Sequence, residues 1–342
     1  MLKTLLVDGN SILQTGFHGV KDFYHNDKHF GAIFYFLNTL KRNLERQPYD
    51  KIVVFWDGKK NYKYRRDLYP PYKLNRKNKI SKDKLDDMFR QKNRISQYLE
   101  EFFVRQGSYE NCEADDCIAY YCKMSPNEEK TILTNDKDLL QLVNRKVSVI
   151  ITRTDTLVSN NDKIKVGKTP MMVPPCNIPI VKILLGDKSD NIKGIKYFGE
   201  KSLIKYFPEV EKSKLNVNQI LTIAEEKLKE SKQRKNTGLS NLINGISADG
   251  RKGNEFFEIN EKIIDLTNTF LTEESREEII ELINEPLDPE GRENRNVVQM
   301  MKEDGLFTVL PKKDDNWTEF IYPITQIRNK EIKYFKSQKN QK

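Results

Sequence analysis

Cysteine and histidine are scarce in this sequence, which has 4 cysteines and 3 histidines among its 342 residues. The cysteines form no C-x-x-C pair, and the three histidines lack a fourth ligand nearby. A structural zinc site and a disulfide framework are therefore disfavoured. Thiols without a pairing pattern are typical of a reducing compartment, so we expect a cytoplasmic protein.

Long apolar runs are also missing. No stretch of about 18 consecutive apolar residues occurs, and the apolar run before Asp8 is too short for a signal peptide. We therefore expect no association with a membrane. The hydrophobic share of 37% and the aromatic share of 10% still suffice for one large or two ordinary folded domains.

Acidic residues are outnumbered, since 50 Asp and Glu stand against 59 Lys and Arg, for a net charge of +9. This surplus suits a polyanionic partner, and nucleic acid leads that class. The surplus is concentrated in residues 59–82, where ten Lys or Arg accompany the single acid Asp67 and the break Pro70-Pro71. We expect this arch segment to leave the fold as a mobile or partly disordered cover over an acidic site.

Three short apolar runs each stop at an aspartate: "TLLVD" at Asp8, "KIVVFWD" at Asp57 and "KTILTND" at Asp136. Runs of this kind predict buried parallel strands. A helical pattern over 31–47 lies between the first two runs, and another strand is expected over 146–152. Together they predict an α/β fold with a mostly parallel sheet.

The stretch "NCEADDCIAYY" places three carboxylates, Glu113, Asp115 and Asp116, directly before a helical pattern that runs to about Met124. Two carboxylates about 4 Å apart repel by roughly 4 kcal/mol at an effective dielectric near 20. The first turn of a helix tolerates acids because of the helix dipole, and that explanation alone suffices for an isolated cluster. Across the whole chain, a bound cation explains the crowding better.

Ligand crevices in doubly wound sheets lie beyond the carboxyl ends of the strands, where the three strand-ending aspartates are expected. With the acids of "EADD", "TNDKD" and "GDKSDN", nine carboxylates could meet there. They are Asp8, Asp57, Glu113, Asp115, Asp116, Asp136, Asp138, Asp187 and Asp190. Oxygen ligands at this density predict Mg²⁺, with Mn²⁺ as a substitute. Two such ions about 4 Å apart support phosphodiester hydrolysis.

The C-terminal half has its own patterns. A helical run begins near Pro179, and "GIKYFGEKSLIKYF" (194–207) predicts a helical hairpin whose backbone amides meet phosphates. A long amphipathic helix is expected earlier, over 83–106. Residues 234–254 predict a mobile loop, and the basic tail 327–342 predicts a solvated, disordered end. "VGKTP" at 166–170 imitates a P-loop but lacks its first glycine.

The ordered motifs "VDG", "FWDG", "RRDLYPPYKLNR", "EADD", "TNDKD" and "GDKSDN" resemble the 5′ nuclease family. That family includes phage 5′–3′ exonucleases, the 5′ nuclease domain of bacterial DNA polymerase I and eukaryotic flap endonucleases, and the likeness is greatest to its phage RNase H members. The resemblance implies a PIN-like or resolvase-like fold. It implies a catalytic domain over 1–178, with the arch at about 59–82, and a helical DNA-binding region over 179–342.

The resemblance also assigns roles to residues. The nine acids match the family's metal ligands, and we expect Asp136 to be needed for catalysis together with Lys73 and Arg76, which would act on the scissile phosphate. Tyr197 replaces the middle glycine of the family's hairpin, which puts the hairpin's usual K⁺ site in doubt. The residues expected to contact nucleic acid are Arg65, Arg66, Tyr72, which would stack on a base, Lys73, Arg76, Gly194, Gly199 and Lys201.

The predicted function is a divalent-metal 5′–3′ nuclease that acts on 5′ ends and flaps of DNA or RNA-primed DNA. If the phage likeness holds, its work is RNA primer removal in DNA replication in a host cytoplasm, as a monomer beside a single-strand DNA-binding protein and a sliding clamp. Two alternatives stay open: a nucleic-acid-binding scaffold of the same fold that has lost catalysis, and a PIN-class ribonuclease. The presence of all nine acids favours the enzyme.

Overall fold

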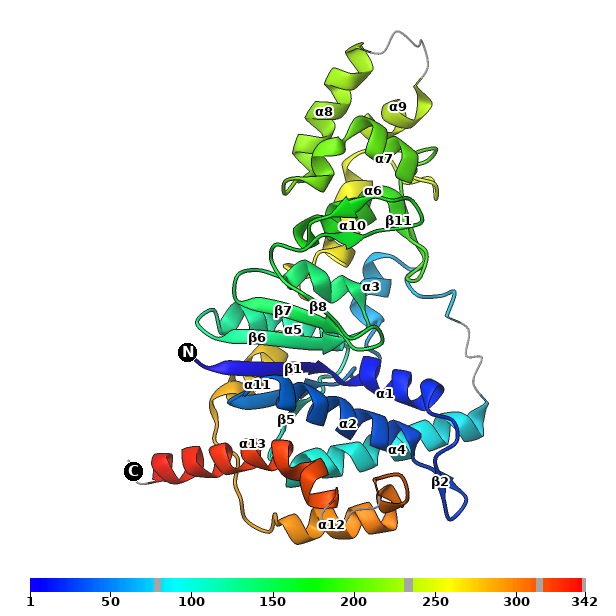
Figure 1. Cartoon of the computed structure of the whole chain (residues 1–342). Coiled ribbons are helices and arrows are strands. Elements are labelled where there is room, and N and C mark those ends of the chain that lie inside the picture. Colours follow the sequence, from blue (N-terminus) through cyan, green and yellow to red (C-terminus); the bar gives the residue numbers. More distant parts are fainter. Residues whose placement is uncertain (77–80, 231–235, 312–315, 340–342) are drawn as a thin grey trace.

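The computed structural model describes residues 1–76, 81–230, 236–311 and 316–339. Its centre is a six-stranded sheet in the order β5-β4-β1-β6-β7-β8 (Figure 1). All neighbouring pairs are parallel except β7 and β8. The strands are β1 Lys3–Asp8, β4 Lys51–Phe55, β5 Arg105–Gly107, β6 Glu129–Thr134, β7 Val147–Ile151 and β8 Thr156–Val158. The predicted mostly parallel α/β sheet is confirmed.

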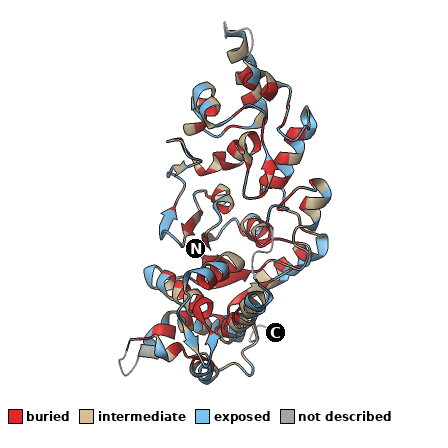
Figure 2. Ribbon diagram, turned by 90° about the vertical axis from the view of Figure 1, so that its right-hand side faces the viewer, coloured by how far each residue is buried: buried red, intermediate tan, exposed pale blue. Residues whose placement is uncertain are grey.

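Alternating side chains of the central strands divide between two cores. Leu5 and Val7 of β1 enter one core, whereas Leu6 enters the other. Because both faces are covered, β1, β4 and β6 each contain a continuous apolar run, and Figure 2 shows buried residues running through this layer. The helices of this part before residue 125 are α1 Gly9–Gly19, α2 Gly31–Arg46, α4 Lys82–Glu101 and α5 Ala114–Met124.

A third core forms a separate lobe above the sheet (Figure 1). Two tyrosines of the arch segment, Tyr69 and Tyr72, are buried in this core, so the arch joins the lobe to the sheet. The lobe and its approaches contain α3 Lys63–Leu68, α6 Ile178–Leu185, α7 Glu200–Tyr206, α8 Val217–Glu230, α9 Thr237–Ile243 and α10 Asn254–Ile264. Short hairpins and turns complete the described chain: β2 Tyr24–His25, β3 Lys28–His29, β9 Ile164–Lys165, β10 Met172–Val173, β11 Gly186–Asp187, β12 Ile192–Lys193, and the 3₁₀ turns Lys137–Leu142, Pro175–Asn177, Pro208–Glu211 and Leu306–Thr308.

The last helices return to the sheet instead of extending the lobe. They are α11 Glu273–Asn284, α12 Asn294–Glu303 and α13 Asn316–Lys339. Helix α11 packs on α5 and β5, α12 on α4, and α13 on α2 and β4. The expected C-terminal region beginning at 179 is therefore not one body, since only its first part, through α10, builds the lobe.

Two expected disordered segments are ordered where the structure describes them. Within 234–254, α9 buries Leu239 and Leu242 in the lobe core; residues 234 and 235 lie outside the described part. The basic tail was expected to be solvated, but α13 continues to Lys339. Its Glu331 is buried and pairs with Arg105 at 2.9 Å, because the edge strand β5 needs cover.

Arg105 ties three distant segments together. It donates to the backbone carbonyls of Leu282 at 2.9 Å and Glu285 at 2.5 Å in addition to its pair with Glu331. The strand β5 that carries it was missed by the sequence analysis, which extended the preceding helix to residue 106; the helix α4 in fact ends at Glu101. Among the described residues, no helix combines the length and apolar character needed to cross a bilayer.

Candidate active site

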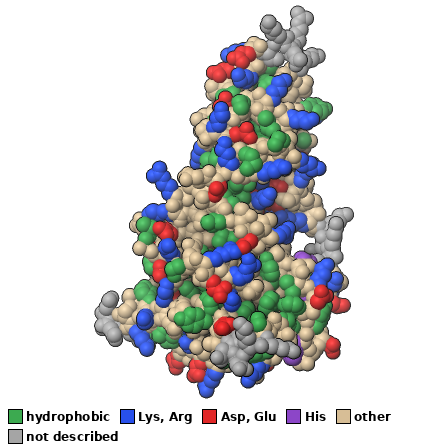
Figure 3. All heavy atoms as spheres, viewed as in Figure 1, with side chains coloured by type: hydrophobic (Ala, Val, Ile, Leu, Met, Phe, Trp, Pro, Cys, Tyr) green, Lys and Arg blue, Asp and Glu red, His purple; other side chains and the backbone are tan. Residues whose placement is uncertain are grey.

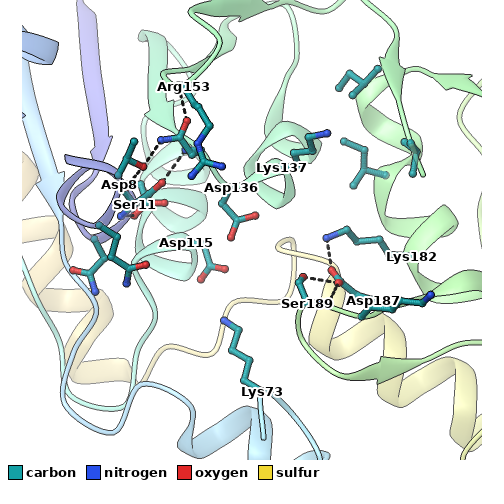
Figure 4. Close-up of a pocket in the computed structure, with 18 of the residues that line it drawn as sticks. Asp8, Ser11, Lys73, Asp115, Asp136, Lys137, Arg153, Lys182, Asp187 and Ser189 are labelled. Atoms are coloured by element: carbon teal, nitrogen blue, oxygen red, sulfur yellow. Dashed lines mark hydrogen bonds and ion pairs between the residues drawn. The ribbon is translucent and has the colours of Figure 1, made fainter. Parts of the chain in front are cut away.

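The carboxyl ends of three neighbouring strands supply the first acids of the site. Asp8 ends β1, while Asp57 and Asp136 each follow two residues after β4 and β6. The chain proceeds from β1 to β4 on one side and later to β6 on the other, so β1 marks the switch point of the sheet. All three acids line one cleft of about 1540 Å³ between sheet and lobe (Figure 4).

Asp8 and Asp57 are held in place by neighbouring donors. Asp8 accepts from the Ser11 amide at 3.0 Å and the Thr134 hydroxyl at 2.8 Å. Asp57 accepts from Asn10 at 2.7 Å and from the backbone N–H of Ala114 at 2.9 Å. Burial, together with the nearby carboxylate of Asp57, raises the pKa of Asp8 to about 7. Burial also raises the pKa of Asp57, so both acids would gain from a nearby cation.

Arg65 is a positive partner for the "EADD" cluster. As the buried residue of α3, it donates to Glu113 at 2.8 Å and forms two hydrogen bonds with Asp116, at 2.6 and 3.0 Å. Asp116 is fully buried and also accepts from the Phe270 amide at 3.1 Å. The crowding for which a bound metal ion was expected is therefore relieved in part by Arg65 itself. Arg65 lies too deep to serve as a surface phosphate contact.

The following residues of the arch segment also turn inward. Lys73, only 6% exposed, contacts Glu113 and lies 3.7 Å from Asp190. The Tyr72 hydroxyl donates to Glu113 at 2.9 Å, and its ring is 2% exposed. Tyr72 is thus not placed to stack on a base, because its ring belongs to the lobe core. Residues 59–76 are a packed connection instead of a mobile cover, and residues 77–80 lie outside the described part.

Two further arch residues differ in what they reach. Arg76 is exposed, lines the cleft and pairs with Asp190 at 2.7 Å. Arg66 donates to the backbone carbonyl of Tyr72 at 3.0 Å and stacks over Tyr62, so it supports the shape of the arch. Burial opposes the charge of Glu113, yet Lys73 and Arg65 outweigh it and lower the pKa of that carboxyl.

A second group of acids faces the first across the cleft. The "GDKSDN" motif forms the β11–β12 hairpin, which starts where Gly186 ends α6 with a φ of 77°. Lys182 of α6 contacts Asp138 and lies 2.5 Å from Asp187. Burial next to Asp136 raises the pKa of Asp138 to about 7, whereas Lys182 overcomes the effect of burial and lowers the pKa of Asp187.

Lys182 was missed by the sequence analysis, although it stands five residues before Asp187 in "KILLGD". Its position on α6, just ahead of the turn into the hairpin, was the available signal. Asn10, which follows "VDG" and supports Asp57, was also missed. Both residues contact acids that the sequence proposed for the site: Asp57 and Asp187 line the cleft, whereas Asp138, which contacts Lys182, does not line it.

The donor set fits divalent metal. Carboxylate oxygens lie within 4.8 Å of one another in each of two triads, Glu113–Asp115–Asp116 and Asp138–Asp187–Asp190. Asp115 and Asp136 extend toward the open cleft in Figure 4. Burial raises the pKa of Asp115 well above its usual range despite Arg65. Hard oxygen donors crowded in this way suit Mg²⁺-type ions, with Asp116 the least available because Arg65 and an amide saturate it.

A rim of basic residues surrounds the acids. Its members are Arg76, Lys137, Arg153, Lys165, Lys168 and Lys188. Arg76 pairs with Asp190, whereas the other five form no ion pair within the described part of the chain. In Figure 4 Lys137 and Arg153 stand beside Asp136. Figure 3 shows Lys and Arg distributed over both the lobe and the sheet region of the visible face. This distribution suits a long polyanion.

The predicted helical hairpin borders the same cleft. Gly199 precedes α7 and lines the cleft, and Lys201 is exposed. Gly194 is buried, and a Cβ there would collide with the backbone of Leu185, so its role is close packing. Tyr197 adopts a left-handed φ of 61° and is 72% exposed. It keeps the backbone conformation that a glycine adopts easily, while adding a side chain.

Comparison with known proteins identifies the family. A family model described as the 5′–3′ exonuclease N-terminal resolvase-like domain matches residues 3–168. A 5′–3′ exonuclease of Buchnera aphidicola is 34% identical over 222 residues, which are 63% of this chain and 70% of that protein. One of Bacillus subtilis is 32% identical over 219 residues, 61% of this chain and 71% of that protein.

Solved structures agree on the fold. The phage T5 5′-exonuclease with bound zinc ions has a TM-score of 0.58 at 18% identity, and the match covers 89% of this chain and 98% of that chain.

A further sequence relative is a longer enzyme. DNA polymerase I of Bacillus subtilis is 31% identical over 238 residues, 67% of this chain, but the match spans only 26% of that enzyme. The relatives thus define a nuclease, a phosphodiester hydrolase that cleaves nucleic acid. The chain belongs to the 5′–3′ exonuclease family.

Proposed function

We propose that this nuclease cleaves 5′ ends and 5′ flaps of DNA or RNA-primed DNA with two Mg²⁺ ions, for which Mn²⁺ can substitute. The observation that supports this most is the pair of facing acid groups, one at the ends of β1, β4 and β6 and one on the β11–β12 hairpin. When bound, the two ions would supply an activated water and charge neutralisation at the phosphate. We propose Asp8, Asp57, Asp115, Asp136, Asp138 and Asp187 as their main ligands.

The arch residues would act on the phosphate itself. Lys73 is buried among carboxylates that hold its pKa well above the usual range, so it stays protonated at any working pH despite its burial. Arg76 stands at the cleft with 47% of its side chain exposed. Both cations can stabilise charge that develops on phosphate oxygens, a contribution of several kcal/mol in a preorganised site.

The substrate class follows from the charge around the cleft. Free cations on the rim would neutralise the backbone of a strand that enters, and Gly199 and Lys201 would meet phosphates of the adjoining duplex. RNA primer removal during replication, beside a single-strand DNA-binding protein and a sliding clamp, is our proposal for the cellular role. It rests on the family resemblance, as do the monomeric state, a cytoplasmic location and the doubtful hairpin K⁺ site.

Cleavage of 5′-labelled flap and RNA-primed duplex substrates tests the proposal. We expect cleavage with Mg²⁺ and none with EDTA, and the ratio of the two substrates identifies the preferred one. Asp136→Asn serves as the inactive control. Tight binding of flaps by the wild type without cleavage in Mg²⁺ or Mn²⁺ would favour the scaffold alternative instead.

A further inference from the structure

The loop that looks like the end of a P-loop holds an anion. Between β9 and β10, Gly167 has a φ of 73°, and the next two backbone N–H groups point at the carboxylate of Glu200. The Lys168 amide lies 3.0 and 3.2 Å from its two oxygens, and the Thr169 amide lies 2.9 Å from one of them. Successive amides after a left-handed residue form an anion-binding concavity.

The carboxylate occupies the space that a side chain at residue 167 would fill. A Cβ on Gly167 would collide with the Glu200 carboxyl group, so only glycine leaves this cradle open. The amide hydrogen bond from Thr169 contributes most to a lowered pKa of Glu200, which therefore binds as the anion. We call Gly167 and the amides of Lys168 and Thr169 the amide nest.

The surroundings of the amide nest are those of a phosphate site. Segments 163–170 and 194–206 contain six lysines, and Glu200 is their only acid. Gly167, Lys168, Gly199 and Glu200 all line the cleft that contains the candidate active site. Gly167 and Lys168 are solvent-exposed, so an incoming anion can reach the amides.

We infer that the amide nest is a binding site for a backbone phosphate of the nucleic-acid substrate, and that Glu200 occupies it until that phosphate displaces the carboxylate. This inference rests on the proposed function, since it places a further contact for the duplex beside the same cleft. The amides cannot donate to both anions at once, so Glu200 competes with the substrate and lowers its affinity. A phosphate offers more oxygens to the two amides and to the Lys168 side chain than the carboxylate does.

Two substitutions separate charge from occupancy. Both Glu200→Ala and Glu200→Gln remove one negative charge, but the glutamine amide oxygen can still accept from the amide nest, whereas alanine empties it. We expect Glu200→Ala to bind a 5′-flap duplex, with Ca²⁺ in place of Mg²⁺, about fivefold or more tightly than wild type. Its slope of log K against log salt should equal that of wild type, because the same phosphate occupies the amide nest in both complexes. Glu200→Gln should lie between wild type and Glu200→Ala, with the wild-type slope.

The alternative is a latch, in which Glu200 only fastens the loop to α7. Glu211→Gln is the control for it, because Glu211 accepts from the Met172 amide at 2.8 Å, at the start of β10 just after this loop, without lining the cleft. Weaker flap binding by Glu200→Ala, or equal affinities for the alanine and glutamine variants, would overturn the amide-nest inference. Wild-type flap cleavage in Mg²⁺, measured in parallel, keeps the proposed function separate: normal cleavage with no gain in Glu200→Ala removes only the nest.

Discussion

The two acid groups of the cleft have similar composition but different neutralisation. On the sheet side, Glu113 and Asp116 are paired with Arg65, which is 3% exposed. On the hairpin side, Asp138 and Asp187 share Lys182, which is 19% exposed, and Asp190 pairs with the exposed Arg76. The sheet-side pair lies where water cannot replace a lost partner. The hairpin-side pairs lie where it can, so they are free to exchange their cations for other ligands.

The largest test of this contrast is stability. Arg65→Met leaves the fully buried Asp116 without its cation and Glu113 with Lys73 alone, and we expect it to lower the free energy of unfolding by about 3–5 kcal/mol. Lys182→Met should cost only about 1 kcal/mol, because solvent and the Ser189 donors reach Asp187. Urea unfolding of both variants measures this. Equal losses would show that burial does not distinguish the two groups.

Among the acids of the site, some substitutions should affect cleavage and others stability. Asp136→Asn is expected to reduce single-turnover cleavage by about a thousandfold, or ~4 kcal/mol, with flap binding and stability retained, because its side chain is exposed and faces the cleft. Asp116→Asn should instead lose stability first, since its partners Arg65 and Phe270 are structural. Rapid-quench assays beside melting curves measure both. A stable but inactive Asp116→Asn variant would return Asp116 to the metal ligands.

A smaller effect separates chemistry from positioning in the arch. Lys73→Ala should lower single-turnover cleavage by about a hundredfold, with little change in Kd for a flap. Lys82, exposed at the start of α4, is the control: Lys82→Ala should weaken binding slightly and leave the chemistry near normal. Because Lys73 also neutralises Glu113, melting curves must accompany the assay. Indistinguishable effects of the two variants would remove Lys73 from catalysis.

The smallest effect is a pH dependence at Asp8, whose pKa rises from about 4 in the unfolded chain to about 7 in the fold. A raised carboxyl pKa stabilises the fold fully below pH 4, and that contribution is lost as pH rises through 7. In EDTA at pH 8, the free energy of unfolding of Asp8→Asn should therefore exceed that of wild type by roughly 1–2 kcal/mol. This difference should vanish near pH 4. The pKa shift alone would give a larger difference in free energy. Asparagine reduces it, because it loses the charged hydrogen bonds that Asp8 accepts from Ser11 and Thr134.

Melting the same two proteins with Mg²⁺ completes this test. Wild type should gain stability at pH 8 where Asp8→Asn does not, because the ionised carboxyl would be a ligand. A wild-type protein whose melting temperature is indifferent to both pH and Mg²⁺ would contradict the assignment of Asp8.

The sheet and the membership of the cleft were predictable from sequence because they follow from local patterns. Apolar runs that stop at Asp8, Asp57 and Asp136 specify strands, and parallel strands bring their ends together. The sequence did not predict where each basic side chain points. Arg65 and Arg66 are adjacent and alike in sequence, yet only Arg65 turns inward. Its partner Asp116 is 51 residues away, so the local sequence gives no sign of the contact. Tyr72 reads as a stacking residue until the lobe core encloses it.

The same limit explains the misread segments. Residues 237–243 look like loop by composition, but Leu239 and Leu242 have a core to enter once the lobe assembles. The tail looks like a charged coil, but its first residue, Ile327, joins the core under the sheet. In both cases tertiary burial outweighs local preference.

The pairing of Arg105 with Glu331 has a consequence for synthesis of the chain. The two residues are 226 positions apart, so the edge strand β5 emerges from the ribosome long before the helix that covers its arginine. Contacts of such sequence separation form slowly and leave hydrophobic and strand-edge surface open in the nascent protein. The edge of the N-terminal sheet therefore stays partly uncovered until α13 has been translated. We expect the need for chaperones to be greatest in that interval.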